Sequence, residues 1–391
     1  MNRASIRHFE PAFCPLPNCP SASPGAQFRY RNSGSYLRDC DRRKVQRFYC
    51  HACRRRFSAQ SFRLNYRFRK PQIDAWVFRC MVSKVTHRQT ARLLEVDRKT
   101  IHRRLHRFAP ALHDLHRGVL DCARDAGGIR GSFSLDELET FEGSRRLCPV
   151  TVPALIERRS LFVVHLETGM LGARGHIGKR EIAKRAERER TIGKRRSESR
   201  AMVGRCFARL AVCHRPHGMV EVVTDKKRAY RTELKRFFPN RVGAHITESS
   251  RRARNRSNPL FAINHTFAMM RDQVSRLVRR SWGASKDRKA LKRHLWIWAA
   301  WRNYVRPITN HAPGTTPAMA LGVTDKKLSI QEALRWRWPS RSPGCASQRG
   351  QFPIGVVARA FPSPAPPTAP ESASPHAPSN PRMGRGRHAR S

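Results

Sequence analysis

Two strand-like segments decide the fold: Gly131-Ser-Phe-Ser-Leu-Asp-Glu-Leu-Glu-Thr-Phe-Glu142 and Met219-Val-Glu-Val-Val-Thr-Asp225. Each has the apolar pattern of a β-strand and carries an aspartate, Asp136 at the middle of the first and Asp225 at the end of the second. A buried, unpaired carboxylate is costly unless a cation compensates it. Two carboxylates on adjacent strands would frame two divalent metal ions, whereas ordinary polar residues at strand ends are the plainer interpretation.

The region around these segments alternates strand-like and helical stretches. Apolar runs at 150–156 and 161–166 predict further strands, and a basic helical stretch extends from 179 to about 212. The aromatic stretch 294–304 predicts a core helix that closes the sheet, in preference to a surface that stacks on unpaired bases. Residues 130–325 are therefore predicted to form an α/β domain.

Two short-spaced cysteine pairs characterise residues 1–60. They are Cys14 with Cys19 and Cys50 with Cys53. Such pairs on two turns give tetrahedral Zn²⁺ its four thiolates, so a small zinc ribbon is predicted. Cys40 could replace Cys19, and His51 is a weaker substitute. Reduced, packed cysteines without metal are the alternative.

Residues 70–110 predict three short helices, the third of them basic. The first has Ile73, Trp76, Val77 and Cys80 on one face. Thr86-His-Arg-Gln89 is a capping box that opens the second helix, which carries Leu93, and Asp97 or a neighbour caps the third. This is a helix-turn-helix pattern, whose third helix lies in the major groove of DNA. A helical bundle with a solvated basic face is the alternative. The predicted DNA contacts are Arg98, Lys99, His102 and Arg103.

The amino-acid composition narrows the kind of binding partner and the cellular compartment that we expect for this protein. The 391 residues include 79 Lys and Arg against 28 Asp and Glu, a net charge of +51 that predicts a nucleic-acid partner. No run of 18 apolar residues and no signal peptide in residues 1–15 are visible, so no membrane contact is expected. Eleven cysteines without an export signal predict a reducing compartment, the cytoplasm or its nucleoid. The proline-rich segment 341–391 predicts a disordered tail.

This order of elements resembles the bacterial insertion-sequence transposases of the DDE class, in particular the IS-one type and its relatives. The likeness runs from about Cys14 to Val323 and is strongest from Asn258 to Lys286. It implies that residues 130–325 form an RNase H-like catalytic domain with a mixed sheet and flanking helices. It also implies double-stranded DNA as partner, both element ends and target, and a homodimer or a higher assembly on that DNA.

The resemblance also implies a set of catalytic residues. Asp136 and Asp225 would be the first two ligands of Mg²⁺ or Mn²⁺, and Asn264 lies where the third acid is expected. Arg271 follows seven residues later, two helical turns on, and would hold phosphate or DNA. The implied activity is metal-dependent cleavage at the element ends and strand transfer into target DNA.

Asn264 departs from the family pattern. An asparagine carbonyl can bind magnesium, but it adds no negative charge and cannot act as a base. Some relatives use a third residue other than glutamate, so an active enzyme is still expected. Glu248 is the substitute candidate, and Glu137, Glu139 and His265 are others nearby. The rival function is a catalytically inactive, decayed or repurposed transposase that acts as a sequence-specific DNA-binding protein.

Overall fold

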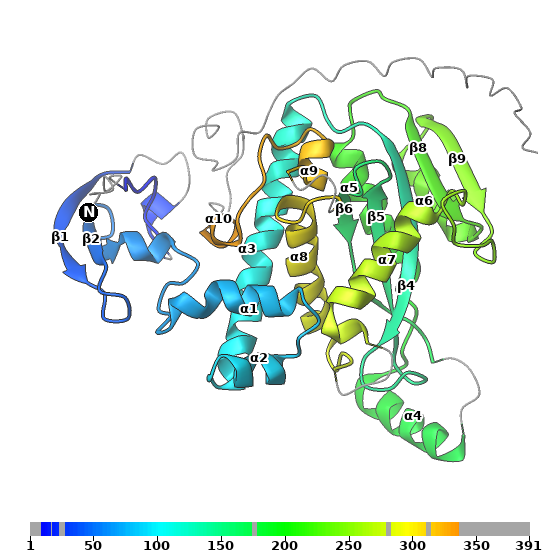
Figure 1. Ribbon diagram of the computed structural model, residues 1–391, viewed down its shortest axis with the longest axis horizontal. Helices are drawn as coiled ribbons and strands as arrows, with labels where there is room; N and C mark the ends of the chain where they lie inside the picture. The colour runs from blue at the N-terminus through cyan, green and yellow to red at the C-terminus, as the bar shows by residue number, and fades with distance from the viewer. Residues whose placement is uncertain are drawn as a thin grey trace, which may run out of the picture. The chain divides into compact units, whose positions relative to one another are not determined.

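The computed structural model describes residues 9–335 except 17, 23–27, 174–177, 279–282 and 310–313 (Figure 1). The predicted tail 341–391 lies outside the described residues. The chain has the expected α/β character: a three-stranded sheet at the N-terminus, then a mixed sheet flanked by helices. The elements in chain order are β1 (Tyr30–Leu37), β2 (Lys44–Cys50), β3 (Arg56–Ser58), α1 (Asp74–Met81), α2 (His87–Leu93), α3 (Arg98–Asp125), β4 (Ser132–Phe141), β5 (Pro149–Glu157), β6 (Val163–Leu166), β7 (Gly169–Met170), α4 (Lys179–Ile192), α5 (Ser199–Cys213), β8 (Val220–Asp225), α6 (Arg228–Phe237), β9 (Val242–Glu248), α7 (Phe261–Gln273), α8 (Arg288–Tyr304), α9 (Pro317–Ala320) and α10 (Ile330–Arg335).

The N-terminal sheet is an antiparallel meander of β1, β2 and β3. Its small core is mostly aromatic: Phe48 and Phe57 stack with their ring centroids 5.4 Å apart, and Tyr30 meets Phe48 edge-on. The described part of this region has few aliphatic side chains to bury. Aromatic pairs and the neighbouring cysteines therefore supply most of its interior.

Helices α1, α2 and α3 follow, with the predicted caps in place. Thr86 and Gln89 form the capping box of α2: the Gln89 N–H donates to Thr86 Oγ1 at 3.3 Å and the Thr86 N–H donates to Gln89 Oε1 at 2.9 Å. Asp97 caps α3, its carboxylate accepting the N–H of Lys99 at 2.5 Å. Both helix starts are thus encoded in short local sequence.

The prediction of the buried faces of α1 and α2 was partly wrong. Trp76 and Leu93, expected in the core, are 57% and 67% exposed. Val77 is buried as expected, and Phe78 and Met81 are buried with it, in a core that includes side chains of α3 and α8. An apolar stripe of four residues on a helix this short does not show which side of it will meet another helix.

Helix α3 does not end near residue 110, the expected limit of the three-helix segment, but continues to Asp125. Its buried side chains recur at spacings of four and three residues along the whole helix, which gives one continuous apolar stripe. Pro110 lies within the helix on its exposed side, where the missing N–H is least disruptive. The stripe consists of Ile101, Leu105, Phe108, Leu112, Leu115 and Val119.

The central sheet has the strand order β6-β5-β4-β8-β9, and the short β7 pairs with β5. Strands β4, β5 and β6 are antiparallel neighbours, whereas β8 runs parallel to both β4 and β9. Successive residues of β4 alternate between the two faces. Leu135 belongs to the core shared with α3, α5 and α6, and Leu138 belongs to the core shared with α7 and α8.

Helix α8 is the core helix that the aromatic stretch predicted. Trp298 and Tyr304 are fully buried, and Trp298 Nε1 donates to Gln273 Oε1 at 2.7 Å, which links α8 to α7. No helix in the described ranges is long and apolar enough to cross a membrane.

We expect Leu112→Ala to lower the free energy of unfolding by about 2–5 kcal/mol, because it leaves a cavity in the fully buried stripe of α3. Leu93→Ala removes the same atoms from an exposed position of α2 and should change stability by less than about 0.5 kcal/mol. Urea denaturation followed by tryptophan fluorescence measures both. Equal midpoints for the two variants would contradict a continuous buried stripe.

Candidate functional site

Four cysteines of the N-terminal region meet in one place. Cys50 ends β2 and Cys53 lies in the turn that follows, while Cys14 and Cys19 approach from the loop before β1. Sγ of Cys14 lies 3.8 Å from Sγ of Cys53, and Sγ of Cys19 lies 3.8 Å from that of Cys50. All four sulfur atoms lie within 4.8 Å of one another, and three of the four residues are buried.

This arrangement fits a tetrahedral metal. Zn–S bonds near 2.3 Å place the sulfurs of such a site about 3.8 Å apart, which is the spacing found here. Burial raises the pKa of the Cys14 and Cys19 thiols, so a cation is needed to hold them as thiolates. The group could therefore hold a zinc ion. The alternative ligands fall outside it: Cys40 lies in the β1–β2 turn beside Asp41, and His51 packs edge-on against Tyr49.

Asp136 and Asp225 lie on neighbouring strands at the same level of the sheet. The last paired residues of β4 and β8 are Leu135 and Thr224, and the two aspartates follow them directly. Since side chains alternate along a strand, both aspartates point to the face opposite Leu135. Leu138 and Val223, two positions from them on that face, pack in the core with α7. The sheet thus brings together two carboxylates that are 89 positions apart in the chain.

The two carboxylates have different surroundings. Burial raises the pKa of Asp136 to about 7, and the negative charges of Asp225 and Glu137 act in the same direction. The Glu137 N–H donates to Asp136 Oδ1 at 2.7 Å and opposes this rise. Asp225 accepts the N–H of Lys227 at 2.9 Å. A half-buried carboxyl next to a second one is what a divalent cation would stabilise.

Glu248 extends the row by one strand, since it pairs with Asp225 in the β8–β9 ladder. It is not free, however. Arg252 donates to its carboxylate at 2.5 Å and the Ser249 N–H at 2.8 Å, and these hydrogen bonds hold the pKa of Glu248 below its usual range. Among the described residues, the ligand atoms of Asp136, Asp225 and Glu248 are not gathered as tightly as those of the four cysteines.

Asn264 and Arg271 both lie on α7, the helix over this face of the sheet. Ile263, Phe267 and Met270 are its buried side, which packs on the sheet, while Asn264 and Arg271 are half-buried at the helix margin. The structure places Asn264 and Arg271 on the same helix over this face of the sheet, and no hydrogen bond of the described residues joins the Asn264 side chain to either aspartate.

Glu137 points away from the aspartates, because it is one residue further along β4. Its carboxylate accepts hydrogen bonds from Thr151 Oγ1 at 2.8 Å, Ser199 Oγ at 2.7 Å and Tyr230 Oη at 3.0 Å, and pairs with Lys227. Burial by itself would raise the pKa of Glu137, but these partners hold it below its usual range. Glu137 is therefore a structural carboxylate that ties β4 to α5 and α6, a role that the sequence reasoning missed.

Two further sequence candidates lie elsewhere. Glu139 is exposed on β4, on the same face as Glu137 and not on that of Asp136. His265 stacks on Phe261, and burial together with the nearby Arg302 and Arg306 lowers its pKa. These surroundings direct His265 toward α8 rather than toward the carboxylates.

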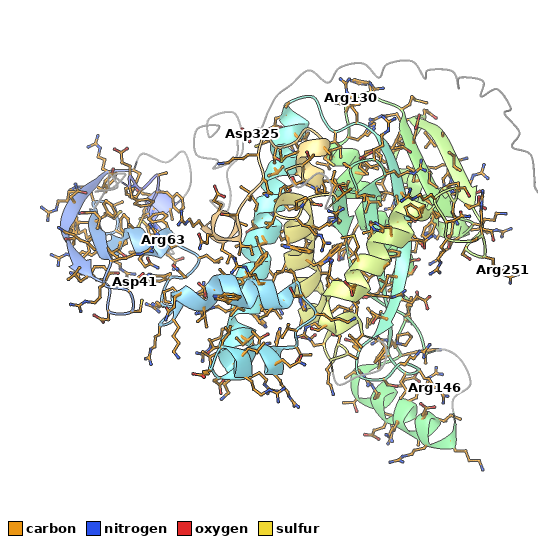
Figure 2. All side chains as sticks on the ribbon, viewed as in Figure 1. Asp41, Arg63, Arg130, Arg146, Arg251 and Asp325 are labelled. Carbon is orange, nitrogen blue, oxygen red and sulfur yellow. The ribbon has the colours of Figure 1, made fainter. Side chains whose placement is uncertain are left out.

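An arginine-rich loop follows Glu248, directly beyond the carboxylate row. Residues 249–258 lie between β9 and α7 and include Arg251, Arg252, Arg254 and Arg256, all exposed. Figure 2 labels Arg251 at the outer edge of the molecule. The charge of Arg254 reaches Asp136 and lowers its pKa slightly. Sequence reasoning missed this loop, although four arginines in six residues just after a strand were a readable signal.

The predicted DNA contacts share one exposed surface at the start of α3. Arg98, Lys99, His102 and Arg103 are all exposed on its first two turns. A groove runs beside them and is lined in part by the segment that precedes α1, which sequence reasoning did not include. The basic residues that this groove adds are Arg67, Arg69, Lys70 and Arg107.

Comparison with known proteins adds no relative: no family model matches this chain, and no curated protein matches its sequence.

We expect Cys50→Ser to abolish zinc binding and to unfold the N-terminal sheet, because that sheet has only a small aromatic core without the metal. Metal content by mass spectrometry and protease sensitivity of residues 9–62 measure the two effects. Cys40→Ser is the matched control, since Cys40 lies outside the group. Full zinc occupancy in Cys50→Ser, or equal loss in Cys40→Ser, would contradict the four-cysteine site.

Proposed function

We propose that this protein is a DNA transposase that cuts the ends of an insertion sequence and joins them to target DNA. The observation that carries the proposal is the placement of Asp136 and Asp225 on one face of two adjacent parallel strands, beneath α7 and beside the arginine-rich loop 249–258. Carboxylates in such a row hold divalent cations, and arginines beside them hold phosphates. Phosphoryl transfer on a polyanion needs both the bound cations and the groups that hold the phosphates.

The proposed catalytic domain has the RNase H-like fold. An antiparallel meander of β4, β5 and β6 that continues into the parallel strands β8 and β9 supports this assignment. Helices on both faces of the sheet support it further: the crossover helix α5 lies on one face, and α7, which follows the last strand, lies on the other. In this proposal Asp225 lies at the carboxyl end of β8, the edge at which open sheets bind ligands, and Asp136 lies beside it at the middle of β4.

The proposed reaction has two steps. A water molecule attacks the phosphorus at the element end and releases a DNA 3′-hydroxyl, which then attacks a phosphodiester of the target and displaces its 3′ oxygen. Mg²⁺ or Mn²⁺ bound to Asp136, Asp225 and Asn264 would activate the attacking oxygen and stabilise the leaving one. Arg271 and the arginine-rich loop would position the phosphates. The family likeness implies that two copies act together on two ends.

DNA recognition is assigned to the N-terminal half. We propose that α1, α2 and α3 form a helix-turn-helix that reads the element ends through Arg98, Lys99, His102 and Arg103. A zinc ribbon held by the four cysteines would bind the adjacent backbone. The exposure of all four α3 residues and the basic groove beside them support this division.

A second function has an observation in its favour. Asn264 provides no charge, and Glu248, the nearest substitute acid, is paired with Arg252. If no third acid completes the site, the chain would bind element ends without cutting them and act as a sequence-specific DNA-binding protein.

We expect Asp136→Ala and Asp225→Ala each to reduce end cleavage and strand transfer by more than about 100-fold, because each removes a metal ligand. Radiolabelled DNA that flanks the gene, incubated with Mg²⁺ or Mn²⁺, reports both steps. Glu221→Gln is the matched control, an exposed carboxylate on β8 away from the site. Activity that survives both aspartate substitutions would refute the site, and binding without any cleavage by the wild type would favour the second function.

We expect Arg103→Ala to weaken binding to a selected DNA site by about 1–3 kcal/mol and to relax its base preference. Arg117→Ala is the matched control, an exposed arginine further along the same helix that pairs with Asp114. Fluorescence anisotropy on a site selected from random DNA, and on a scrambled duplex, measures both quantities. An equal loss of affinity for the selected and the scrambled duplex would show that Arg103 contacts only phosphate.

A further inference from the structure

Helix α4 is a basic helix that buries none of its own residues. Its 14 residues include six Lys or Arg and three Glu, and no side chain of α4 is buried. Figure 1 labels α4 at the lower edge of the view. Ile182 and Ile192 are 55% and 71% exposed. Most helices in proteins gain their stability by packing an apolar face, which α4 does not do. The need to bury an apolar face therefore does not explain the sequence of α4.

The three glutamates of α4 are already paired. Glu189 accepts from Arg185 at 2.8 Å one turn away, and Glu187 accepts from Arg190 at 2.6 Å. Glu181 pairs with Arg146, in the loop after β4, at 2.8 Å. These exposed pairs stabilise the helix itself only slightly. Within the described part of the chain, no ion pair joins the remaining cations of α4 to an acid, although the charge of Lys184 acts on Glu181.

Four exposed cations of α4 form no ion pair with any described residue: Lys179, Arg180, Lys184 and Arg188. The last three are spaced at four residues, so they lie on one side of the helix about 6 Å apart. Together they span about 12 Å, the length of three to four phosphates along one DNA strand. The row thus matches a polyanion in both charge and spacing.

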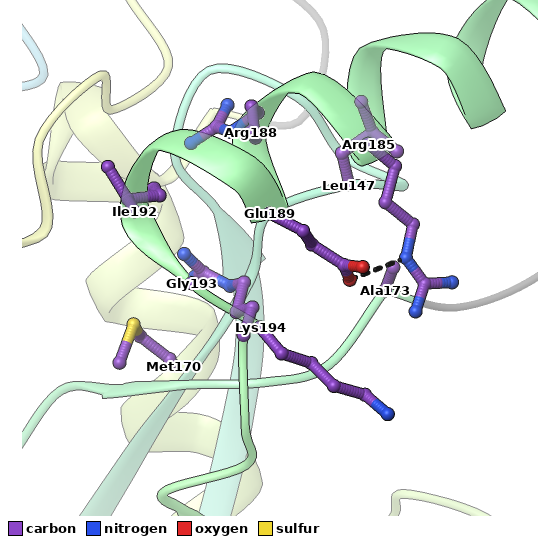
Figure 3. A pocket seen from close by; sticks show the side chains of 10 residues that line it. Leu147, Met170, Ala173, Arg185, Arg188, Glu189, Ile192, Gly193 and Lys194 are labelled. Atoms are coloured by element: carbon purple, nitrogen blue, oxygen red, sulfur yellow. Dashed lines mark hydrogen bonds and ion pairs between the residues drawn. The ribbon is translucent and has the colours of Figure 1, made fainter.

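The C-terminal end of α4 is fixed to the loop that follows β4. The helix stops at Gly193, whose φ of 80° favours glycine, and Arg195 then donates to Glu142 at 2.8 Å and to the carbonyl of Pro149 at 2.9 Å. Figure 3 shows a small hollow beside this end of α4: Arg185 and Glu189 are joined there, Met170 lies across it, and the exposed Arg188 is at its edge. A charged helix is thus held at one end by the segment that links β4 to β5.

We propose that α4 is an arm that binds the phosphate backbone of double-stranded DNA through Arg180, Lys184 and Arg188. The choice of DNA as the polyanion that α4 binds rests on the proposed function. A second copy of the chain does not fit this surface, because two identical basic rows would repel each other. Contacts to phosphate carry no base information, so the arm contributes affinity to any sequence, in contrast to the start of α3.

The test replaces Arg180, Lys184 and Arg188 together with Gln in the full chain, which keeps a good helix former at exposed positions. Affinity for a random-sequence duplex is measured without Mg²⁺ at several salt concentrations. We expect about tenfold weaker binding and a salt slope, of log K against log [salt], that is shallower by about two to three. Circular dichroism confirms that the variant folds.

The matched control replaces Arg228, Arg231 and Lys235 of α6 with Gln, which removes the same charge from another exposed helix. An unchanged slope in the α4 variant, or an equal change in the α6 variant, would overturn the arm. The measurement does not depend on cleavage. If the wild-type protein never cuts DNA but the α4 variant has the shallower slope, the transposase proposal is refuted and the α4 proposal stands. If the wild-type protein cuts DNA but the α4 variant keeps the wild-type slope, only the α4 proposal is refuted.

Discussion

The parallel register between β4 and β8 is the constraint on which the site depends. It aligns Leu135 with Thr224, so the next residue of each strand is an aspartate on the same face. A slip by one residue in either strand would send one carboxylate into the core beneath α5 and α6. The apolar residues on both sides of the sheet oppose such a slip. The hydrophobic pattern that forms the core therefore also fixes the relative position of the two acids.

The same alternation separates two carboxylates that are adjacent in sequence. Glu137 meets Lys227, Ser199, Thr151 and Tyr230, and is held as a charge within the protein. Asp136 has no such set of donors, and burial raises its pKa to about 7. The Glu137 carboxylate is neutralised by Lys227, whereas the only positive charge that acts on Asp136 among its main influences is that of Arg254. This contrast, more than the presence of acids on strands, is what supports the proposed cation site on the Asp136 face.

The sequence predicted features that depend on near neighbours. The capping box at Thr86, the grouping of the four cysteines into two short pairs and the α/β alternation all arise within short stretches of chain. It did not predict the partners of Glu137, since Ser199 and Lys227 lie 62 and 90 positions away. The exposure of Trp76 also depended on where α3 and α8 would pack. Long-range contacts decided these cases, and no local pattern encodes them.

The charge of the chain has a structural consequence beyond partner choice. With 79 cations and 28 acids, one-to-one pairing would leave 51 cations unmatched, and several acids serve two arginines at once. Glu233, for example, binds both Arg200 and Arg236. The folded chain therefore concentrates like charge, which destabilises it relative to a more expanded state. A polyanion that binds only the folded form would relieve this repulsion and add its binding free energy to stability. Under the proposed function, DNA binding and folding would be coupled through charge.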